Sequence, residues 1–163
     1  MSKRGYIILS IVIVAVVIST AAILPIYQSI ERGKAAKSAL SRTEVVSVLT
    51  MDSVRMDISL KDGPVLLIFY NSTCDVCHDQ LQEIQEKRDR LPRGLKIYAI
   101  TNEPAIDASI ADPEFTYLRA ATESDCFALF NIQSVPTIML FSQQKSPVKL
   151  IGFKHCEEIL QVF

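Results

Sequence analysis

The sequence predicts an α/β domain, in which helices flank a central mixed sheet, behind a single transmembrane helix at the amino terminus. Residues 5–27 contain no charged side chain, and residues 65–70 form a short run that is apolar throughout. Apolar residues then recur at helical spacing between residues 77 and 91. Strand-like segments that alternate with helix-like segments in this way are typical of α/β layers.

Length, charge and cysteine content narrow the classes of protein to consider. The chain has 163 residues, so one domain of ordinary size fits beside the apolar segment. The 17 basic and 18 acidic residues give a net charge of -1, and no nucleic-acid partner is expected from that balance. Four cysteines are too few for a small disulfide scaffold, and two of them lie three residues apart. This pattern indicates redox or metal chemistry.

Residues 6–27 are long and apolar enough to cross the core of a bilayer as one helix, which takes about 20 residues. A cleavable signal peptide is the alternative, because Lys3 and Arg4 precede the segment and small residues occur at 20–22. The apolar run continues beyond those small residues, through Ile26. This continuation favours an anchor that stays in the membrane.

The expected organisation is an anchor at residues 1–28, a spacer at residues 29–43 and one folded domain at residues 44–163. The spacer is polar and compatible with a helix. Basic side chains lie on both sides of the anchor, so the positive-inside rule does not decide its orientation. The basic start resembles a bacterial signal anchor. That resemblance implies a single-pass protein of the inner (cytoplasmic) membrane, with its domain on the periplasmic or extracytoplasmic side.

The strands are expected from apolar runs and from alternation. Residues 54–60 alternate apolar and polar side chains, as a half-buried strand does, while residues 65–70 suit a central strand covered on both faces. The expected strands are, in chain order, residues 45–49, 54–60, 65–70, 95–100, 137–141 and 148–153. The last two are joined by polar residues, which predicts a terminal hairpin.

The main helix is expected to begin at Cys74 and to extend to Leu91, where Pro92 and Gly94 stop it. On this helix Cys77 faces inward, one turn after Cys74. Shorter helices are expected at residues 105–111, at residues 124–130 with Ser124 as the cap, and from His155 or Cys156 onward.

Cys74-Asp75-Val76-Cys77 carries the chemistry, because it lies where a buried strand ends and a helix begins. At this spacing two sulfurs can close a small disulfide ring, and the helix amino terminus stabilises a thiolate on the first cysteine. Cys74 is therefore expected to be the exposed nucleophile. Cys77 is expected to resolve the mixed disulfide by attacking the sulfur of Cys74.

Ser134-Val135-Pro136-Thr137 opens a later strand and supplies the second half of the pattern. With it the sequence resembles the thioredoxin superfamily, and in particular the TlpA/ResA-like membrane-tethered thiol-disulfide proteins, over about residues 45–163. The resemblance implies a thioredoxin-like fold. It also implies that Pro136 is cis and lies beside the disulfide, and that Val135 pairs with an extended peptide by strand addition.

The same resemblance implies the activity and the partners. The chain is expected to be a thiol-disulfide oxidoreductase that exchanges a Cys74-Cys77 disulfide or dithiol with protein substrates, as a reductase. An upstream electron donor or acceptor protein is the other expected partner. The redox-active disulfide is the reactive group, so no cofactor and no metal are expected.

Several positions depart from the pattern of the family. Thr73 replaces the aromatic residue that usually precedes the first cysteine, and Val76 replaces the common proline. Ile68 and Gln80 stand where relatives carry carboxylates that move protons to or from the second cysteine. Asp75, Val76 and His78 are therefore the candidates for tuning the pair, and the negative charge of Asp75 should oppose a thiolate on Cys74.

Cys126 and Cys156 lie in or beside expected helices, among apolar residues. A free cysteine is often buried as a small hydrophobic residue, so a structural role is expected for both. A second disulfide between them is the open alternative. A zinc site that combines them with Cys74 and Cys77 is not favoured, because their spacing is not paired.

Two other functions compete with thiol-disulfide exchange. Cys74 to His78 matches the C-x-x-C-H signature of c-type haem attachment, which predicts an electron carrier. Candidate distal ligands are Met51, Met56, Met139 and His155. A thioredoxin-like metal chaperone that binds a soft ion such as Cu(I) through Cys74 and Cys77 is the third possibility.

Overall fold

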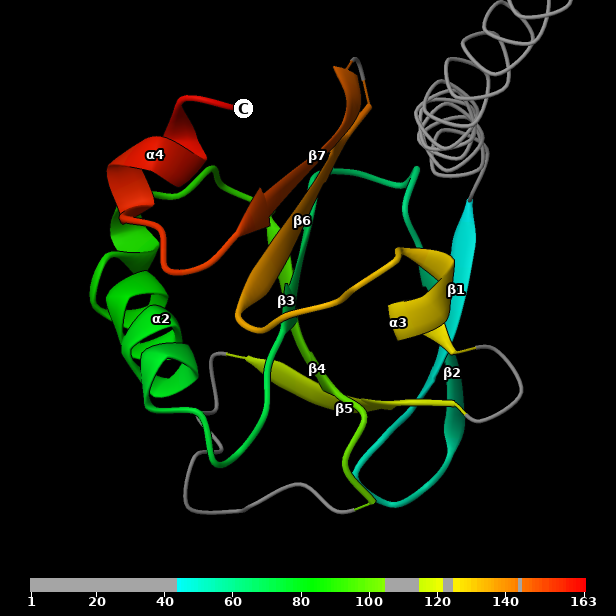
Figure 1. The fold of residues 1–163 in the computed structure, drawn as a ribbon. Helices are drawn as coiled ribbons and strands as arrows, with labels where there is room; N and C mark the ends of the chain where they lie inside the picture. The colour runs from blue at the N-terminus through cyan, green and yellow to red at the C-terminus, as the bar shows by residue number, and fades with distance from the viewer. Residues whose placement is uncertain (1–43, 105–114, 122–124, 144) are drawn as a thin grey trace, which may run out of the picture. The chain divides into compact units, whose positions relative to one another are not determined.

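The computed structural model describes residues 44–104, 115–121, 125–143 and 145–163 (Figure 1). The expected anchor (1–28), spacer (29–43) and helix at 105–111 lie outside these residues. Within the described ranges, no helix has the length and apolar character needed to cross a membrane.

Seven strands and three α-helices build the described part of the domain. The strands are β1 (Val45–Leu49), β2 (Arg55–Ser59), β3 (Val65–Phe69), β4 (Lys96–Thr101), β5 (Thr116–Ala120), β6 (Thr137–Ser142) and β7 (Lys145–Ile151). The helices are α2 (Asp75–Glu86), α3 (Cys126–Leu129) and α4 (Cys156–Leu160), with a 3-10 turn at Arg88–Arg90.

All seven strands join one mixed sheet in the order β2-β1-β5-β4-β3-β6-β7. The central strands β3, β4 and β5 are parallel, whereas β1, β2, β6 and β7 pair with their neighbours antiparallel. The expected α/β layer with a mixed sheet is therefore present. In Figure 1, α2 and α4 lie on one side of the sheet and α3 lies on the other.

β3 separates two hydrophobic cores because it is buried on both faces, as its apolar run predicted. Leu66 and Ile68 point into the core under α2 and α4. Leu67 and Phe69 point into the core under α3. Alternate side chains of a strand face opposite ways, so a strand between two cores must be apolar at every position.

β5 is a strand that the sequence analysis did not predict. It lies between β1 and β4 in the sheet, and Tyr117 and Leu118 enter opposite cores. Thr116 and Arg119 interrupt the apolar pattern of this segment. A strand of only five residues is then difficult to predict from the sequence. Its place is fixed by pairing with β4 and not by its own sequence.

Several element ends differ from those expected. α2 ends at Glu86 and not at residue 91, because a separate 3-10 turn follows it. Asp125 and not Ser124 caps α3, since its carboxylate accepts a hydrogen bond from the N–H of Phe127 at 2.9 Å; Ser124 lies outside the described residues. The last strand covers residues 145–151 and not 148–153, because Gly152 turns the chain with a φ of 78°.

Candidate active site

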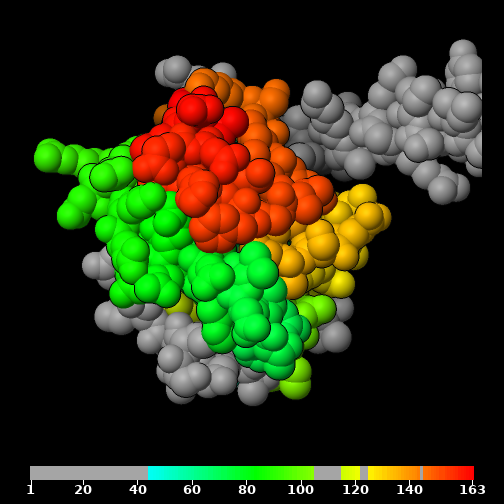
Figure 2. Space-filling view, turned by 60° about the vertical axis from the view of Figure 1, so that its left-hand side comes forward, coloured from blue at the N-terminus to red at the C-terminus, as the bar shows by residue number. Residues whose placement is uncertain are grey.

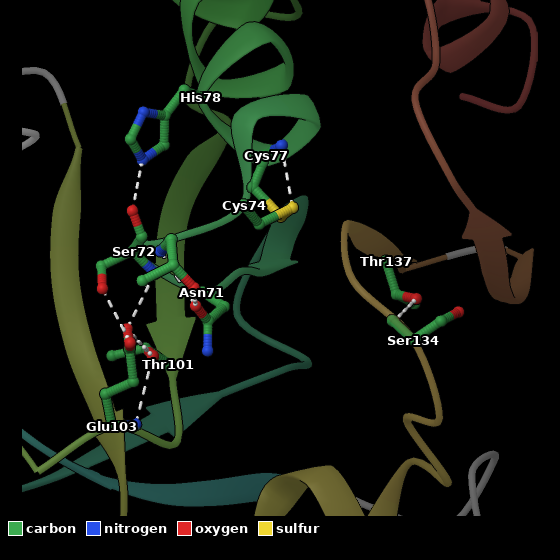
Figure 3. The surroundings of a disulfide bond; sticks show 10 residues. Asn71, Ser72, Cys74, Cys77, His78, Thr101, Glu103, Ser134 and Thr137 are labelled. Atoms are coloured by element: carbon green, nitrogen blue, oxygen red, sulfur yellow. Dashed lines mark hydrogen bonds between the residues drawn. A yellow bond between two sulfur atoms is a disulfide. The ribbon is translucent and has the colours of Figure 1, made fainter.

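The cysteine pair lies at the start of α2, directly after β3 and a short loop (Figure 3). Cys74 is the N-cap of the helix, and its Sγ accepts a hydrogen bond from the N–H of Cys77 at 3.2 Å. The two sulfurs form a disulfide. Cys74 is half-buried and Cys77 is fully buried, so Cys74 carries the outer sulfur and Cys77 the inner one.

The first turn of α2 suits the formation of a thiolate on the outer sulfur. The free N–H groups and the positive end of this 12-residue helix favour negative charge at the N-cap position. Asp75 and Val76 are both exposed in that turn, with 47% of Val76 accessible. Reduction would therefore leave a cysteine that is open to solvent on one side and held over helix N–H groups on the other.

Pro136 lies beside the end of the strand that leads to the cysteines. Thr137, the first residue of β6, pairs with Phe69 at the end of β3. The Val135–Pro136 peptide bond is cis, as the resemblance implied. Val135 is half-buried and packs against the same core as Cys74. The two segments of the sequence pattern thus meet at one end of the sheet.

His78 does not face the disulfide. Its Nε2 donates a hydrogen bond to the backbone carbonyl of Ser72 at 2.8 Å, so the ring contacts the loop before Cys74 (Figure 3). The three side chains of the C-x-x-C-H signature, Cys74, Cys77 and His78, thus lie in a disulfide and in a hydrogen bond to the loop. Among the described residues, no three or more His, Cys, Asp and Glu side chains are grouped so as to hold a metal ion.

Glu103 belongs to the site, although the sequence analysis did not single it out. Its carboxylate accepts hydrogen bonds from the N–H and the Oγ of Ser72, at 2.8 and 2.7 Å, and from Oγ1 of Thr101 at 3.0 Å. The carboxyl ends of parallel strands lie at one edge of a sheet, so a residue just after β4 reaches the loop just after β3. The position of Glu103 just after an expected strand was the signal in the sequence that could have pointed to it.

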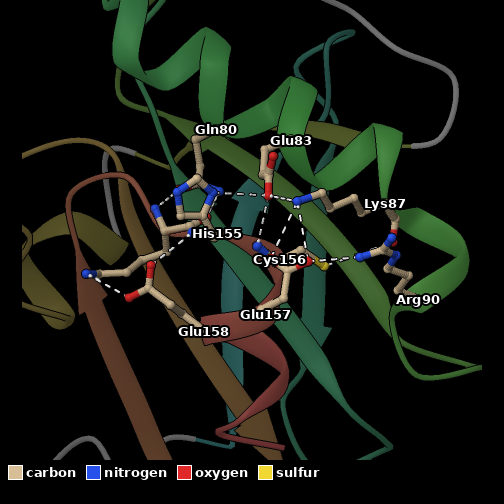
Figure 4. Close-up of polar contacts among 9 residues, drawn as sticks. Gln80, Glu83, Lys87, Arg90, His155, Cys156, Glu157 and Glu158 are labelled. Carbon is tan, nitrogen blue, oxygen red and sulfur yellow. Dashed lines mark hydrogen bonds and ion pairs between the residues drawn. The ribbon is translucent and has the colours of Figure 1, made fainter.

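Gln80 has a structural role. It is fully buried, and its Nε2 donates to the carbonyl of Lys154 at 2.9 Å while its Oε1 accepts from the N–H of Lys154 at 2.6 Å (Figure 4). An amide matches both the N–H and the carbonyl of Lys154, whereas a carboxylate can accept only. Gln80 therefore joins α2 to the loop before α4 and does not carry a proton.

Charged residues hold α4 against α2 further along (Figure 4). The carboxylate of Glu83 accepts from Nζ of Lys87 at 2.7 Å and from the N–H of Cys156 at 3.1 Å. These two contacts, the one from Lys87 first, lower the pKa of Glu83. Glu157 pairs with Lys87 at 3.4 Å and with Arg90 at 2.9 Å. The start of α4 is thus fixed on the side of α2.

Cys126 and Cys156 are free and fully buried. They lie in different cores, on opposite faces of the sheet, so they do not form the second disulfide that the sequence left open. Burial, followed by the charge of Asp125, raises the pKa of Cys126 to about 12, and burial also raises the pKa of Cys156. Both thiols are thus buried, as expected for cysteines that pack as small hydrophobic residues.

A shallow groove runs along α2 beside the cysteine pair. Its walls are formed by Val76, Asp79, Gln82, Glu83, Glu86 and Phe153. The space-filling view of Figure 2 looks onto this side, where α2 in green lies beside the orange and red chain of β7 and α4. The N–H of Gly152 donates to the carbonyl of Pro136 at 2.9 Å, so the loop that carries Phe153 also contacts the proline.

Comparison with known proteins supports the fold. The profile of the family TraF, described as F plasmid transfer operon protein, matches residues 38–154. No curated protein sequence matches the chain. The structure is similar to StoA from Bacillus subtilis, with a TM-score of 0.57, 18% identity, and coverage of 74% of this chain and 97% of StoA.

Two further solved structures have the same fold. The pneumococcal exposed lipoprotein thioredoxin Etrx1 from Streptococcus pneumoniae has a TM-score of 0.58 and 17% identity, over 72% of this chain and 96% of its own. A secreted disulfide oxidoreductase from Mycobacterium tuberculosis has a TM-score of 0.53 and 15% identity, over 75% and 93% of the two chains. At these identities the likeness establishes a thioredoxin-like fold.

Proposed function

The chain belongs to the TraF family of F plasmid transfer operon proteins, and we propose that it is a membrane-anchored thiol-disulfide oxidoreductase that works through Cys74 and Cys77. The observation that supports this most directly is the half-buried Cys74 at the N-cap of α2, joined by a disulfide to the buried Cys77. This arrangement gives the sulfur of Cys74 access to a partner, while the sulfur of Cys77 stays buried next to it.

The proposed reaction is the reduction of a protein disulfide. The Cys74 thiolate attacks one sulfur of the substrate, the substrate disulfide breaks, and its second sulfur leaves as a thiolate that takes up a proton. Cys77 then loses its proton and attacks Sγ of Cys74, which releases the first substrate sulfur as a thiol. Two electrons pass from the dithiol to the substrate, and an upstream donor protein restores Cys74 and Cys77 to thiols.

We propose that an extended segment of the substrate binds beside Val135 and Pro136 by strand addition. The position of these residues just before the start of β6, next to the strand that leads to Cys74, supports this site. The groove that begins at Val76 and includes Phe153 can take side chains that follow the substrate cysteine. The substrates are therefore proteins with an accessible disulfide.

The proposed location is the outer side of the cytoplasmic membrane, with residues 1–28 as the anchor and residues 29–43 as the spacer. The apolar segment at residues 6–27 supports the anchor. Two proteins of similar structure are described as an exposed lipoprotein and as a secreted oxidoreductase. After mild reduction, a membrane-impermeant maleimide should label Cys74 in intact cells. Labelling that requires lysis would place the domain in the cytosol.

Trapping with single variants tests the enzyme function. In Cys77→Ser the outer sulfur can still attack, but no thiol remains to release the mixed disulfide, so reductant-sensitive complexes should accumulate. Cys74→Ser should show neither turnover nor complexes, because Cys77 is fully buried. Cys126→Ala, which changes a buried cysteine in the other core, is the control and should keep full turnover. If neither active-site variant traps a protein, the proposed function fails.

A further inference from the structure

The backbone of Ser72 is held at both its N–H and its carbonyl group. Its N–H donates to the carboxylate of Glu103 at 2.8 Å, and its carbonyl accepts from Nε2 of His78 at 2.8 Å (Figure 3). Ser72 lies two residues before Cys74 in the chain. The backbone that enters the N-cap is therefore fixed just before the attacking sulfur.

Glu103 brings this support from another part of the fold. Two further hydrogen bonds of the loop are local, from the N–H of Thr73 to Oδ1 of Asn71 and from the N–H of Cys74 to the carbonyl of Asn71. Glu103, in contrast, follows β4 and joins the loop to the sheet. A local turn sets its own shape, but only a contact to the sheet sets where that turn lies.

The carboxylate of Glu103 is itself braced. Thr101, fully buried at the end of β4, donates from Oγ1 to Glu103 at 3.0 Å and accepts from the N–H of Glu103 at 3.2 Å. Three donors thus converge on the two oxygens of one carboxylate, two of them from Ser72. Hydrogen bonds to a charged acceptor are stronger than neutral ones, so this contact resists displacement.

The N-cap residue Cys74 follows this supported loop. Sγ of Cys74 lies 3.2 Å from the N–H of Cys77, and a thiolate gains from that donor only while the loop stays in place. We propose that Glu103 is a positioning residue for Cys74, which holds the sulfur over the first turn of α2 through Ser72. The inference rests on the proposed function, because it assumes that Cys74 is the attacking thiol.

Placement and charge make opposite predictions for Glu103. As a negative charge near the loop, Glu103 would oppose a thiolate, so its removal would speed the reaction of Cys74. As a positioning residue it favours the thiolate, so its loss would slow that reaction. Two conservative variants separate the effects. Glu103→Gln removes the charge but can still accept from Ser72 N–H and Thr101, while its NH2 donates to the Ser72 hydroxyl. Glu103→Asp keeps the charge but is one methylene too short to span Ser72 and Thr101 together.

The experiment follows alkylation of Cys74 by iodoacetamide in the reduced full-length protein against pH, with the modified peptide measured by mass spectrometry. Glu103→Asp and Glu103→Ala should react about tenfold more slowly at pH 7, with the midpoint of the profile moved to higher pH. Glu103→Gln should stay within roughly twofold of the wild type. Asp89→Ala, an exposed acid beyond α2, is the control and should not change the profile.

Two outcomes would overturn the inference. Wild-type reactivity in Glu103→Asp would mean that placement by Glu103 does not matter, and faster alkylation in Glu103→Gln would mean that its charge dominates. The Asp and Gln variants decide the question even if Glu103→Ala does not fold. Failure of the proposed function would give a different result. The wild type would then be alkylated normally at Cys74 but would not reduce the disulfides of insulin.

Discussion

Cys74 and Cys126 each lie at the start of a helix, but on opposite faces of the sheet and in opposite surroundings. At α2 the cysteine is itself the N-cap, and its half-buried sulfur accepts a hydrogen bond from the N–H of Cys77. At α3 the cap is Asp125, whose carboxylate accepts a hydrogen bond from the N–H of Phe127. The cysteine that follows it is fully buried. The start of a helix is therefore not enough to favour a thiolate, because burial and the charge of Asp125 raise the pKa of Cys126.

The largest difference should appear in thiol labelling of the reduced, folded protein. The pKa of Cys126 is raised to about 12 by burial and by the charge of Asp125. An ordinary cysteine has a pKa of about 8.5, so at pH 8 Cys126 should react about a thousandfold more slowly than Cys74. Its rate should keep rising as the pH approaches 12. Mass spectrometry of labelled peptides measures both rates. Fast labelling of Cys126 without unfolding would remove the contrast between the two helix starts.

A second prediction concerns Gln80, which fixes the start of α4 and so keeps Cys156 buried. Gln80→Glu places a carboxylate against the Lys154 carbonyl, and the free energy of unfolding should fall by about 1–3 kcal/mol in urea denaturation. Labelling of Cys156 should become faster, while that of Cys126, on the other face, should not change.

Gln82→Glu is the matched control for this substitution. Gln82 is exposed on the same helix, and its Nε2 donates to Glu86 at 2.8 Å. The control should change the free energy of unfolding by less than about 0.5 kcal/mol. Equal destabilisation by the two variants would show that the hydrogen bonds between Gln80 and Lys154 make no specific contribution to the free energy of unfolding.

The smallest expected effect is on alkaline stability. Because the folded-state pKa of Cys126 is raised, its contribution is complete below about pH 8.5, where the thiol is neutral in both states. It is lost as the pH rises toward 12, since only the unfolded chain releases the proton. Between pH 8 and about pH 9.5 the wild type should lose about 1 kcal/mol more than Cys126→Ala. Parallel pH dependence of the two proteins in urea denaturation would contradict the buried, neutral thiol.

Local patterns in the sequence were enough to predict the central strand β3, the cysteine at the start of α2 and the place of Pro136 just before β6. Each of these depends on a short run of neighbouring residues. Glu103 and Gln80 were not predictable in their roles, because their partners lie 31 and 74 residues away in the chain. β5 escaped for the same reason, since its neighbours in the sheet define it more than its own residues do.

The outer strands of the sheet discourage aggregation. β7 carries Lys145, Lys149 and Pro147, and its pairing with β6 is irregular near Pro147. β2, at the opposite edge, exposes Arg55 and Asp57. Charged side chains, proline and irregular pairing all hinder a second chain from extending a sheet at its border. Crowded copies of this domain should therefore stay separate.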